Sequence, residues 1–217
     1  MDIKNLAGFE KVIINNIGEL FEESKWLHRL GHYPRAYTLS HLAFEENAKI
    51  TFLTFLAWDI FAGKEFSNDE VEKIFRSQLF TDHKLKLKIA FLKLPGFDYQ
   101  KSVQQINALN ILKNKSIYAD MFEGEICKPS DFFGNNQSSA MIEITKNTLQ
   151  KRIEELGFSQ INHIKKITNE VIENYYHNMK SLFDSQFQLQ NWNYVEYLKD
   201  IIKNENLFNK VKRTFET

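Results

Sequence analysis

The feature that most constrains the fold is a long, mostly apolar stretch over residues 33–63, YPRAYTLSHLAFEENAKITFLTFLAWDIFAG, with a polar cluster in its middle. On a helix of about 100° per residue, Glu45 and Lys49 share a line with Phe52, which should face the core. A charge removed from water costs several kcal/mol unless it is paired and hydrogen-bonded. We therefore expect other parts of the chain to supply polar partners to this stripe.

The composition indicates helices. The chain of 217 residues has only 8 Gly and 3 Pro, and its apolar residues recur at helical spacing over long runs. Few helix breakers and long periodic runs are typical of helical bundles, and a chain of this length can bury a substantial core. The sequence therefore predicts an all-α fold, an up-and-down helical bundle with additional C-terminal helices.

Charge and cysteine content narrow the class of protein. The 28 basic and 28 acidic residues balance, which argues against a protein that coats DNA or an anionic membrane but leaves room for a local basic patch. The longest apolar run, residues 50–63, is interrupted by polar residues and is shorter than the ~20 residues that a spanning helix needs. Cys127 is alone, so an internal disulfide is excluded. We predict a cytoplasmic protein with no membrane and no DNA partner.

The apolar periods and the turn signals divide the chain into segments. Helices are expected over residues 5–30, 34–62, 67–94, 98–123, 139–156, 160–187 and 192–208. Residues 124–138 are expected to form a loop, and residues 210–217 a frayed end. We predict a core unit over residues 1–125, on which the loop and C-terminal helices of residues 126–217 pack.

Three consecutive predicted helices place polar residues among core positions. The residues are Glu45, Glu46 and Lys49, then His83 and Lys86, then Lys113, Lys115, Tyr118 and Asp120. If these helices are neighbours, the side chains converge on a buried polar centre. The simpler interpretation is structural. Glu45 and Lys49 then form an ordinary exposed helix pair, which stabilises a helix by only about 0.2–0.5 kcal/mol. The stem of Lys113 reaches solvent, and His83 is an ordinary core histidine.

The same residues carry a family resemblance. EENAK on one helix, DHKLK on the next and NKSIYAD on a third resemble the AbiV family of abortive-infection proteins over residues 5–125. In that pattern Glu-Glu-x-x-Lys precedes His-x-x-Lys, and a basic residue precedes Tyr-x-Asp. The resemblance implies a HEPN-like helical domain. Many members of the HEPN group are metal-independent ribonucleases and dimers.

The sequence departs from the HEPN ribonuclease motif, in which Arg precedes His by a few residues on one helix. Here Lys113 stands in the place of the arginine and Tyr118 in the place of the histidine. Cleavage of RNA through the 2′-hydroxyl needs a base, cations that hold the phosphate, and an acid. The predicted catalytic set is therefore His83 as base, Lys113 and Lys115 on the phosphate, and Tyr118 as acid or hydrogen-bond donor.

The remaining residues are predicted to form a buried polar network. Its members are Glu45, Glu46, Lys49, Lys86 and Asp120, of which Glu45 and Asp120 orient the cations. No cofactor and no metal are expected. A metal site built from Glu45, Glu46, His83 and Asp120 is disfavoured, because the Glu-x-x-His pairs of di-metal bundles are missing and lysines lie beside the carboxylates.

Two functions follow from this pattern. The resemblance implies a toxin-like effector of phage defence, a homodimer that halts growth of the infected cell by acting on RNA or on the translation machinery. In the alternative, the polar set only fixes the geometry of the bundle, and the protein binds a phage-encoded or ribosome-associated partner without catalysis. The sequence leaves open whether the protein is an enzyme.

Overall fold

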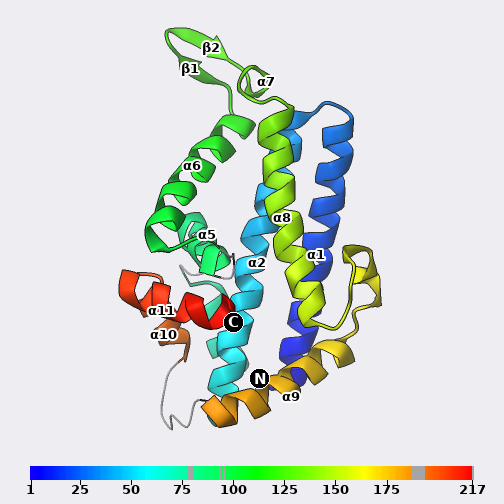
Figure 1. The fold of residues 1–217 in the computed structure, drawn as a ribbon, viewed down its shortest axis with the longest axis vertical. Coiled ribbons are helices and arrows are strands. Elements are labelled where there is room, and N and C mark those ends of the chain that lie inside the picture. The colour runs from blue at the N-terminus through cyan, green and yellow to red at the C-terminus, as the bar shows by residue number, and fades with distance from the viewer. Residues whose placement is uncertain (78–80, 93, 95, 187–193, 217) are drawn as a thin grey trace.

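The chain folds into a helical bundle (Figure 1), and the computed structural model describes residues 1–77, 81–92, 94, 96–186 and 194–216. The long helices are α1 (Ile3–Arg29), α2 (Tyr33–Phe61), α6 (Tyr99–Ile117), α8 (Asn135–Glu155) and α9 (Asn169–Gln186). The short helices are α3 (Asn68–Phe75), α5 (His83–Leu92), α7 (Pro129–Phe132), η1 (Ile161–Lys166), α10 (Tyr194–Ile201) and α11 (Glu205–Glu216). Strands β1 (Asp120–Phe122) and β2 (Glu125–Cys127) form an antiparallel hairpin. The prediction of an all-α helical bundle is confirmed.

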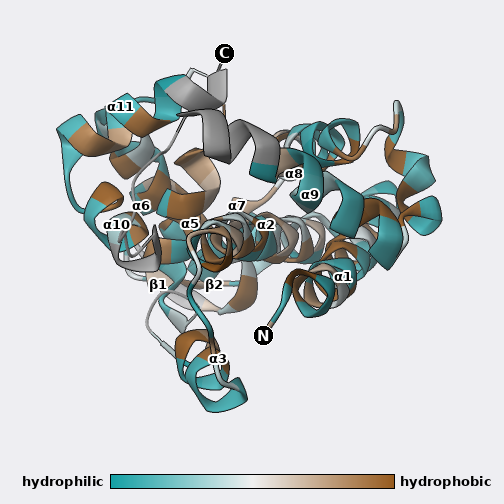
Figure 2. Ribbon diagram, turned by 90° about the horizontal axis from the view of Figure 1, so that it is seen from below, coloured by the Kyte–Doolittle hydropathy of each residue, from teal (hydrophilic) through white to brown (hydrophobic). Residues whose placement is uncertain are grey.

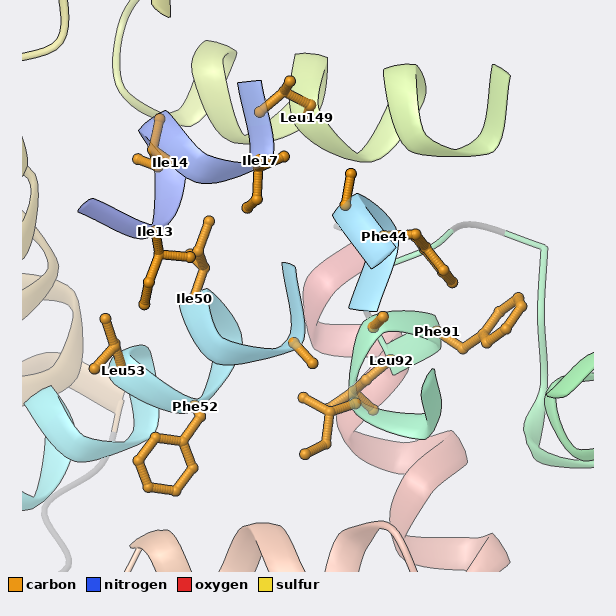
Figure 3. Packing of buried hydrophobic residues seen from close by; sticks show 14 of the residues in the cluster. Ile13, Ile14, Ile17, Phe44, Ile50, Phe52, Leu53, Phe91, Leu92 and Leu149 are labelled. Carbon is orange, nitrogen blue, oxygen red and sulfur yellow. The ribbon is translucent and has the colours of Figure 1, made fainter. Parts of the chain in front are cut away.

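Helix α2 is the axis of the bundle. It packs against α1, α5, α6, α8 and α10, and the view along the bundle shows it in the middle (Figure 2). Because its sequence is apolar nearly all round, it buries side chains on every side. Figure 3 shows Phe44 and Leu53 of α2 among apolar residues of α1, α5 and α8. Polar side chains in the middle of α2 can therefore be buried, and Glu45 is 1% exposed.

The turn between α1 and α2 follows the sequence signals. Gly31 adopts a left-handed backbone with φ of +79°, which glycine adopts without the steric cost that a Cβ brings. Pro34 lies in the first turn of α2, where its missing N–H costs nothing. The two helices therefore run antiparallel after a short connection.

The expected single helix over residues 67–94 is wrong. Helix α3 begins with the predicted capping box of Ser67 and Glu70 but ends at Phe75, and α5 begins at His83. The reason is local, since Asp82 Oδ1 accepts hydrogen bonds from the backbone N–H groups of Lys84 at 2.8 Å and Leu85 at 3.1 Å. Asp82 thus acts as an N-cap and starts a new helix.

The expected helix over residues 98–123 and the loop over 124–138 are also wrong in detail. Helix α6 stops at Ile117, and Tyr118 takes an extended backbone. The chain then forms the hairpin, whose turn contains Glu123 and Gly124, both with positive φ. Helix α7 and the first turn of α8 follow. Tyr118 and Asp120 therefore lie beyond the helix on which they were expected.

The C-terminal part also differs from the expected helices. The segment expected as one helix over residues 160–187 is η1 followed by α9, with Thr168 Oγ1 accepting from the N–H of Val171 at 3.3 Å. The expected boundaries at residues 187 and 192 lie outside the described residues. The frayed end is wrong, because α11 continues to Glu216 and the buried Lys212 donates to the carbonyl oxygens of Phe91 and Leu94.

Among the described residues, no helix combines the length and the apolar character needed to cross a membrane.

Candidate functional site

Glu45 is the centre of a buried polar cluster. Its side chain, 1% exposed, leaves the middle of α2 between α5 and α6. Oε1 lies 3.0 Å from Nε2 of His41 and 3.2 Å from Nζ of Lys113. Oε2 lies 2.6 Å from Nδ1 of His83 and 2.9 Å from Nζ of Lys86. We call these five residues the Glu45 cluster.

The cluster joins three elements whose polar residues we expected to converge if the three helices were neighbours. Glu45 comes from α2, His83 and Lys86 lie one turn apart at the start of α5, and Lys113 lies in the last turns of α6. Because α5 starts at His83, the cap at Asp82 decides where this imidazole lies. The structure thus brings together four of the residues singled out from the sequence.

The carboxyl of Glu45 is ionised at neutral pH. Burial raises its pKa, but the hydrogen bonds from His41, Lys86 and His83 outweigh burial and hold the pKa well below its usual range. One carboxylate therefore faces two ammonium groups and two imidazoles. The cluster carries a net positive charge, which suits an anionic ligand better than a metal cation.

His41 belongs to the cluster and was missed in the sequence analysis. It is fully buried on α2, one turn before Glu45. Burial lowers the pKa of its imidazole, and the hydrogen bond to Glu45 opposes this only in part. His41 is thus neutral at pH 7, with Nε2–H donating to Glu45, and its Nδ1 has no hydrogen-bond partner among the described atoms. The spacing of four residues from Glu45 was the signal that pointed to it.

Glu46 and Lys49 lie on another face of α2. Their side chains pair with each other at 2.6 Å and are 16% and 26% exposed, and Glu46 also accepts from Nδ2 of Asn16 on α1 at 3.3 Å. This arrangement fits the simpler interpretation of a helix-surface pair. The expectation that both residues belong to the network around Glu45 does not match this geometry.

Lys115, Tyr118 and Asp120 lie where α6 leads into the hairpin. Nζ of Lys115 lies 4.7 Å from the ring centroid of Phe132. Tyr118 caps the end of α6 and is exposed, and Asp120 begins β1. The contacts of Glu45 given above include neither Lys115 nor Tyr118, and the side chain of Asp120 is not among those that the structure describes. The catalytic roles assigned to Lys115 and Tyr118 stay predictions.

The geometry of His83 suits proton transfer. Glu45 binds its Nδ1, and the side chain is 50% exposed, so Nε2 is the nitrogen left to exchange a proton with a ligand. A carboxylate that holds one imidazole nitrogen fixes the ring and its tautomer and supports the other nitrogen as a base. Lys86 and Lys113 are 10% and 8% exposed and supply positive charge beside it.

A second buried ion pair was missed in the sequence analysis. Glu10 on α1 accepts from Nε of Arg152 on α8 at 2.7 Å, and Tyr176 Oη on α9 donates to Glu10 at 2.5 Å. Arg152 also pairs with Glu155 at 2.7 Å. The three partners are distant in sequence, and no local spacing connects them. This set holds α1, α8 and α9 together.

The bundle and its buried polar centre agree with the HEPN-like class of domain that the motifs indicated. Residues 5–150 match the family model HEPN_AbiV, described as AbiV. The chain therefore belongs to the AbiV family, and membership suggests a role in abortive-infection phage defence. The match extends beyond residue 125 and includes most of α8. No curated protein and no solved structure matches the chain.

Proposed function

We propose that the protein is a toxin-like effector of abortive infection, which acts in the cytoplasm and halts growth of the infected cell by acting on RNA or on translation. Two observations support this proposal. The chain belongs to the AbiV family, and the Glu45 cluster combines an oriented, half-exposed imidazole with two lysines. The observation that carries the chemistry is the 2.6 Å contact between Glu45 and Nδ1 of His83.

The reaction that this geometry supports best is cleavage of RNA without a metal. Nε2 of His83 takes the proton of a ribose 2′-hydroxyl, and the 2′-oxygen forms a bond to phosphorus while the bond to the 5′-oxygen breaks. The leaving 5′-oxygen takes a proton from an acid, for which Tyr118 remains the predicted residue. Lys86 and Lys113 lower the cost of the negative charge that builds up on the phosphate.

A second candidate function is binding without catalysis. Lys86 and Lys113 both already contact Glu45 and are nearly buried, an arrangement that also suits a purely structural network. In that case the protein acts through its surface on a phage-encoded or ribosome-associated partner. The two functions predict different growth and RNA results for a folded variant in which residue 83 can no longer act as a base.

The test is expression in the host, with growth and RNA profiles measured together. His83→Ala removes the base, and His83→Gln keeps an amide donor for Glu45 but cannot take a proton. Lys84→Ala is the matched control, because Lys84 is exposed and follows His83 on α5. Lys115→Ala and Tyr118→Phe test the two residues near the hairpin. Circular dichroism shows which variants fold.

We expect the wild type and Lys84→Ala to arrest growth and to yield discrete RNA fragments, and folded His83→Gln to do neither. Arrest without RNA fragments, or a folded His83→Gln that still produces the fragments, would overturn the ribonuclease mechanism. Arrest by folded His83→Gln without fragments would favour the binding function.

A further inference from the structure

Two short helices near the C-terminal end of the chain pack on the helix that carries His83. Helices α10 and α11 lie beside α5 and α6, on the side of α2 away from α1 (Figure 1 and Figure 2). Helix α11 contacts both α5 and α6, and α10 contacts α2. We call α10 and α11 the C-terminal pair. The family match ends at residue 150, well before this pair begins.

Helix α5 depends on its neighbours for its position. It has 10 residues, and isolated helices shorter than about 12–15 residues are marginal in water. Its first turn is held by the cap at Asp82 and by the contacts of His83 and Lys86 with Glu45. The position of its last turn therefore depends on the elements that pack against that end.

Lys212 of α11 binds the last turn of α5. Its Nζ donates to the carbonyl oxygen of Phe91 at 3.3 Å and also to the carbonyl oxygen of Leu94. The end of a helix leaves carbonyl acceptors without helical partners, and a positive charge is favourable there. Lys212 is only 4% exposed, and a lysine is costly to bury unless its ammonium group is hydrogen-bonded. These charged hydrogen bonds thus join α11 to the end of α5.

Lys88 makes a second connection, from the middle of α5. Its Nζ donates to the carbonyl oxygen of Ile202, directly after α10, at 3.2 Å and to Oη of Tyr99 at 3.2 Å. Residues two apart on a helix point about 200° apart, so Lys88 and Lys86 lie on opposite faces of α5. Lys86 faces Glu45 on α2, and Lys88 faces the C-terminal pair. Helix α5 is therefore held between α2 and this pair.

The C-terminal pair also contacts the start of α6. The N–H of Tyr99 donates to Oδ1 of Asn209 at 2.8 Å, and the ring centroids of Tyr99 and Phe208 lie 5.5 Å apart. Nε2 of Gln100 donates to Glu205 at 2.8 Å. The pair thus contacts both helices that supply partners to Glu45, although the five residues of the Glu45 cluster all come from α2, α5 and α6.

We propose that the C-terminal pair positions α5, and that Lys212 is the positioning residue that keeps His83 and Lys86 at Glu45. A helix of this length spans about 15 Å and moves as a rigid element, so a displacement of its last turn also displaces its first. The 2.6 Å contact between His83 and Glu45 is lost when the two atoms separate by about 1 Å more. The consequence for RNA cleavage rests on the proposed function, whereas the positioning is measurable without any activity.

Hydrogen exchange of the backbone amides tests the positioning in the full chain. Lys212→Met removes the charged donor and keeps a side chain of similar length, and Lys210→Met, at an exposed residue of the same helix, is the matched control. We expect Lys212→Met to speed exchange in α5 at least about tenfold and to leave α8 unchanged, and the control to leave both unchanged. Unchanged exchange in α5, or equal acceleration in α5 and α8, would overturn the proposal.

A second variant approaches the same contact from α5. Lys88→Met removes the hydrogen bonds to Ile202 and Tyr99, so it should also speed exchange in α5 but not in α8. It carries the test if circular dichroism shows that Lys212→Met does not fold.

The tautomer of His83 reports on the site itself. Nitrogen-15 NMR at alkaline pH distinguishes a neutral imidazole protonated on Nδ1, which the contact with Glu45 favours, from one protonated on Nε2, which prevails in a free imidazole. We expect the Nδ1–H form in the wild type and in Lys210→Met, and a shift toward the Nε2–H form in folded Lys212→Met and Lys88→Met. Folded variants that keep the Nδ1–H form contradict the positioning role.

RNA cleavage measured on the same samples separates this proposal from the proposed function. If the tautomer and the exchange of α5 change in the variants but the wild type cleaves no RNA, the positioning holds and the ribonuclease mechanism fails. If the wild type cleaves RNA but the variants keep the wild-type tautomer and exchange, the positioning fails and the ribonuclease mechanism stands.

Discussion

At the scale of single residues, Glu45 and Glu46 are adjacent in sequence but have very different surroundings. Glu45 is buried against two lysines and two histidines, whereas Glu46 forms a partly exposed pair with Lys49. Removing one partner of a buried ion pair leaves an uncompensated charge, while a surface pair contributes little. The cost of a substitution should therefore differ sharply between the two positions.

We predict that Glu45→Gln lowers the free energy of unfolding by about 3–5 kcal/mol, because Lys86 and Lys113 keep their charges without a buried carboxylate. Glu46→Gln is the matched control and should cost about 0–1 kcal/mol. Urea unfolding followed by circular dichroism measures both. Equal losses for the two variants would mean that Glu45 is more hydrated than its 1% exposure indicates.

Much of the candidate site could be predicted from the sequence because its polar residues interrupt apolar stripes. Glu45 and Lys113 stand at positions where the helical period requires an apolar side chain, and His83 does so in the helix expected over residues 67–94. The structure brings all three together. The apolar periodicity of the helix alone does not show which polar side chains contact Glu45 and which lie on the flank of the helix. Lys49 was therefore assigned to the network, and His41 was not.

At the scale of elements, the existence of the helices was easier to predict than their ends. Apolar periodicity continues across residues 67–94, but the side chain of Asp82 offers the backbone a cap, and a new helix starts there. Similarly, the apolar period of α6 continues in the sequence through Met121, but the chain reverses at Gly124, which has a positive φ. A short polar residue or a glycine can end or restart a helix although the apolar periodicity continues, because it changes the local backbone hydrogen bonding.

The connection of α1, α8 and α9 through Glu10 had no local signal in the sequence. Glu10 accepts from both Arg152 and Tyr176 and is fully buried. Burial raises the pKa of the Tyr176 hydroxyl well above its usual value, so this group is a neutral donor at all ordinary pH. The hydroxyl of Tyr176 therefore contributes a hydrogen bond to a charged acceptor, which is among the stronger kinds.

We predict that Tyr176→Phe lowers the free energy of unfolding by about 1–3 kcal/mol, because Glu10 loses a buried donor while the ring stays. Tyr175→Phe is the matched control. The ring of Tyr175 lies 4.3 Å from the guanidinium carbon of Arg152, and the substitution keeps that ring, so the change should stay within about 0.5 kcal/mol. Chemical unfolding measures the free energy of unfolding of both variants. If both variants lose a similarly small amount of stability, then Arg152 alone neutralises Glu10.

At the scale of the whole molecule, two buried groups make stability depend on pH in the same direction. Burial keeps His41 neutral in the folded protein by lowering its pKa from the ordinary 6.5, so below that pH the unfolded chain binds a proton that the folded protein does not. Glu45 has a pKa held below the ordinary 4.5, so at still lower pH the unfolded chain again binds the extra proton. Stability should thus fall on acidification in two stages.

We predict that His41→Gln removes the first of these stages. In the wild type the free energy of unfolding should fall as the pH drops below about 6.5, with a contribution from His41 of at most about 1.4 kcal/mol per pH unit. In His41→Gln this contribution disappears, while the loss below about pH 4.5 that Glu45 causes remains. His177→Gln, at an exposed histidine 3.7 Å from Glu173, is the control and should keep the wild-type slope. Unfolding curves at a series of pH values give the slopes directly.

If His41→Gln and the wild type lose stability in parallel above pH 5, then His41 takes up its proton equally in the folded and unfolded states, and the acid sensitivity of the bundle comes from elsewhere.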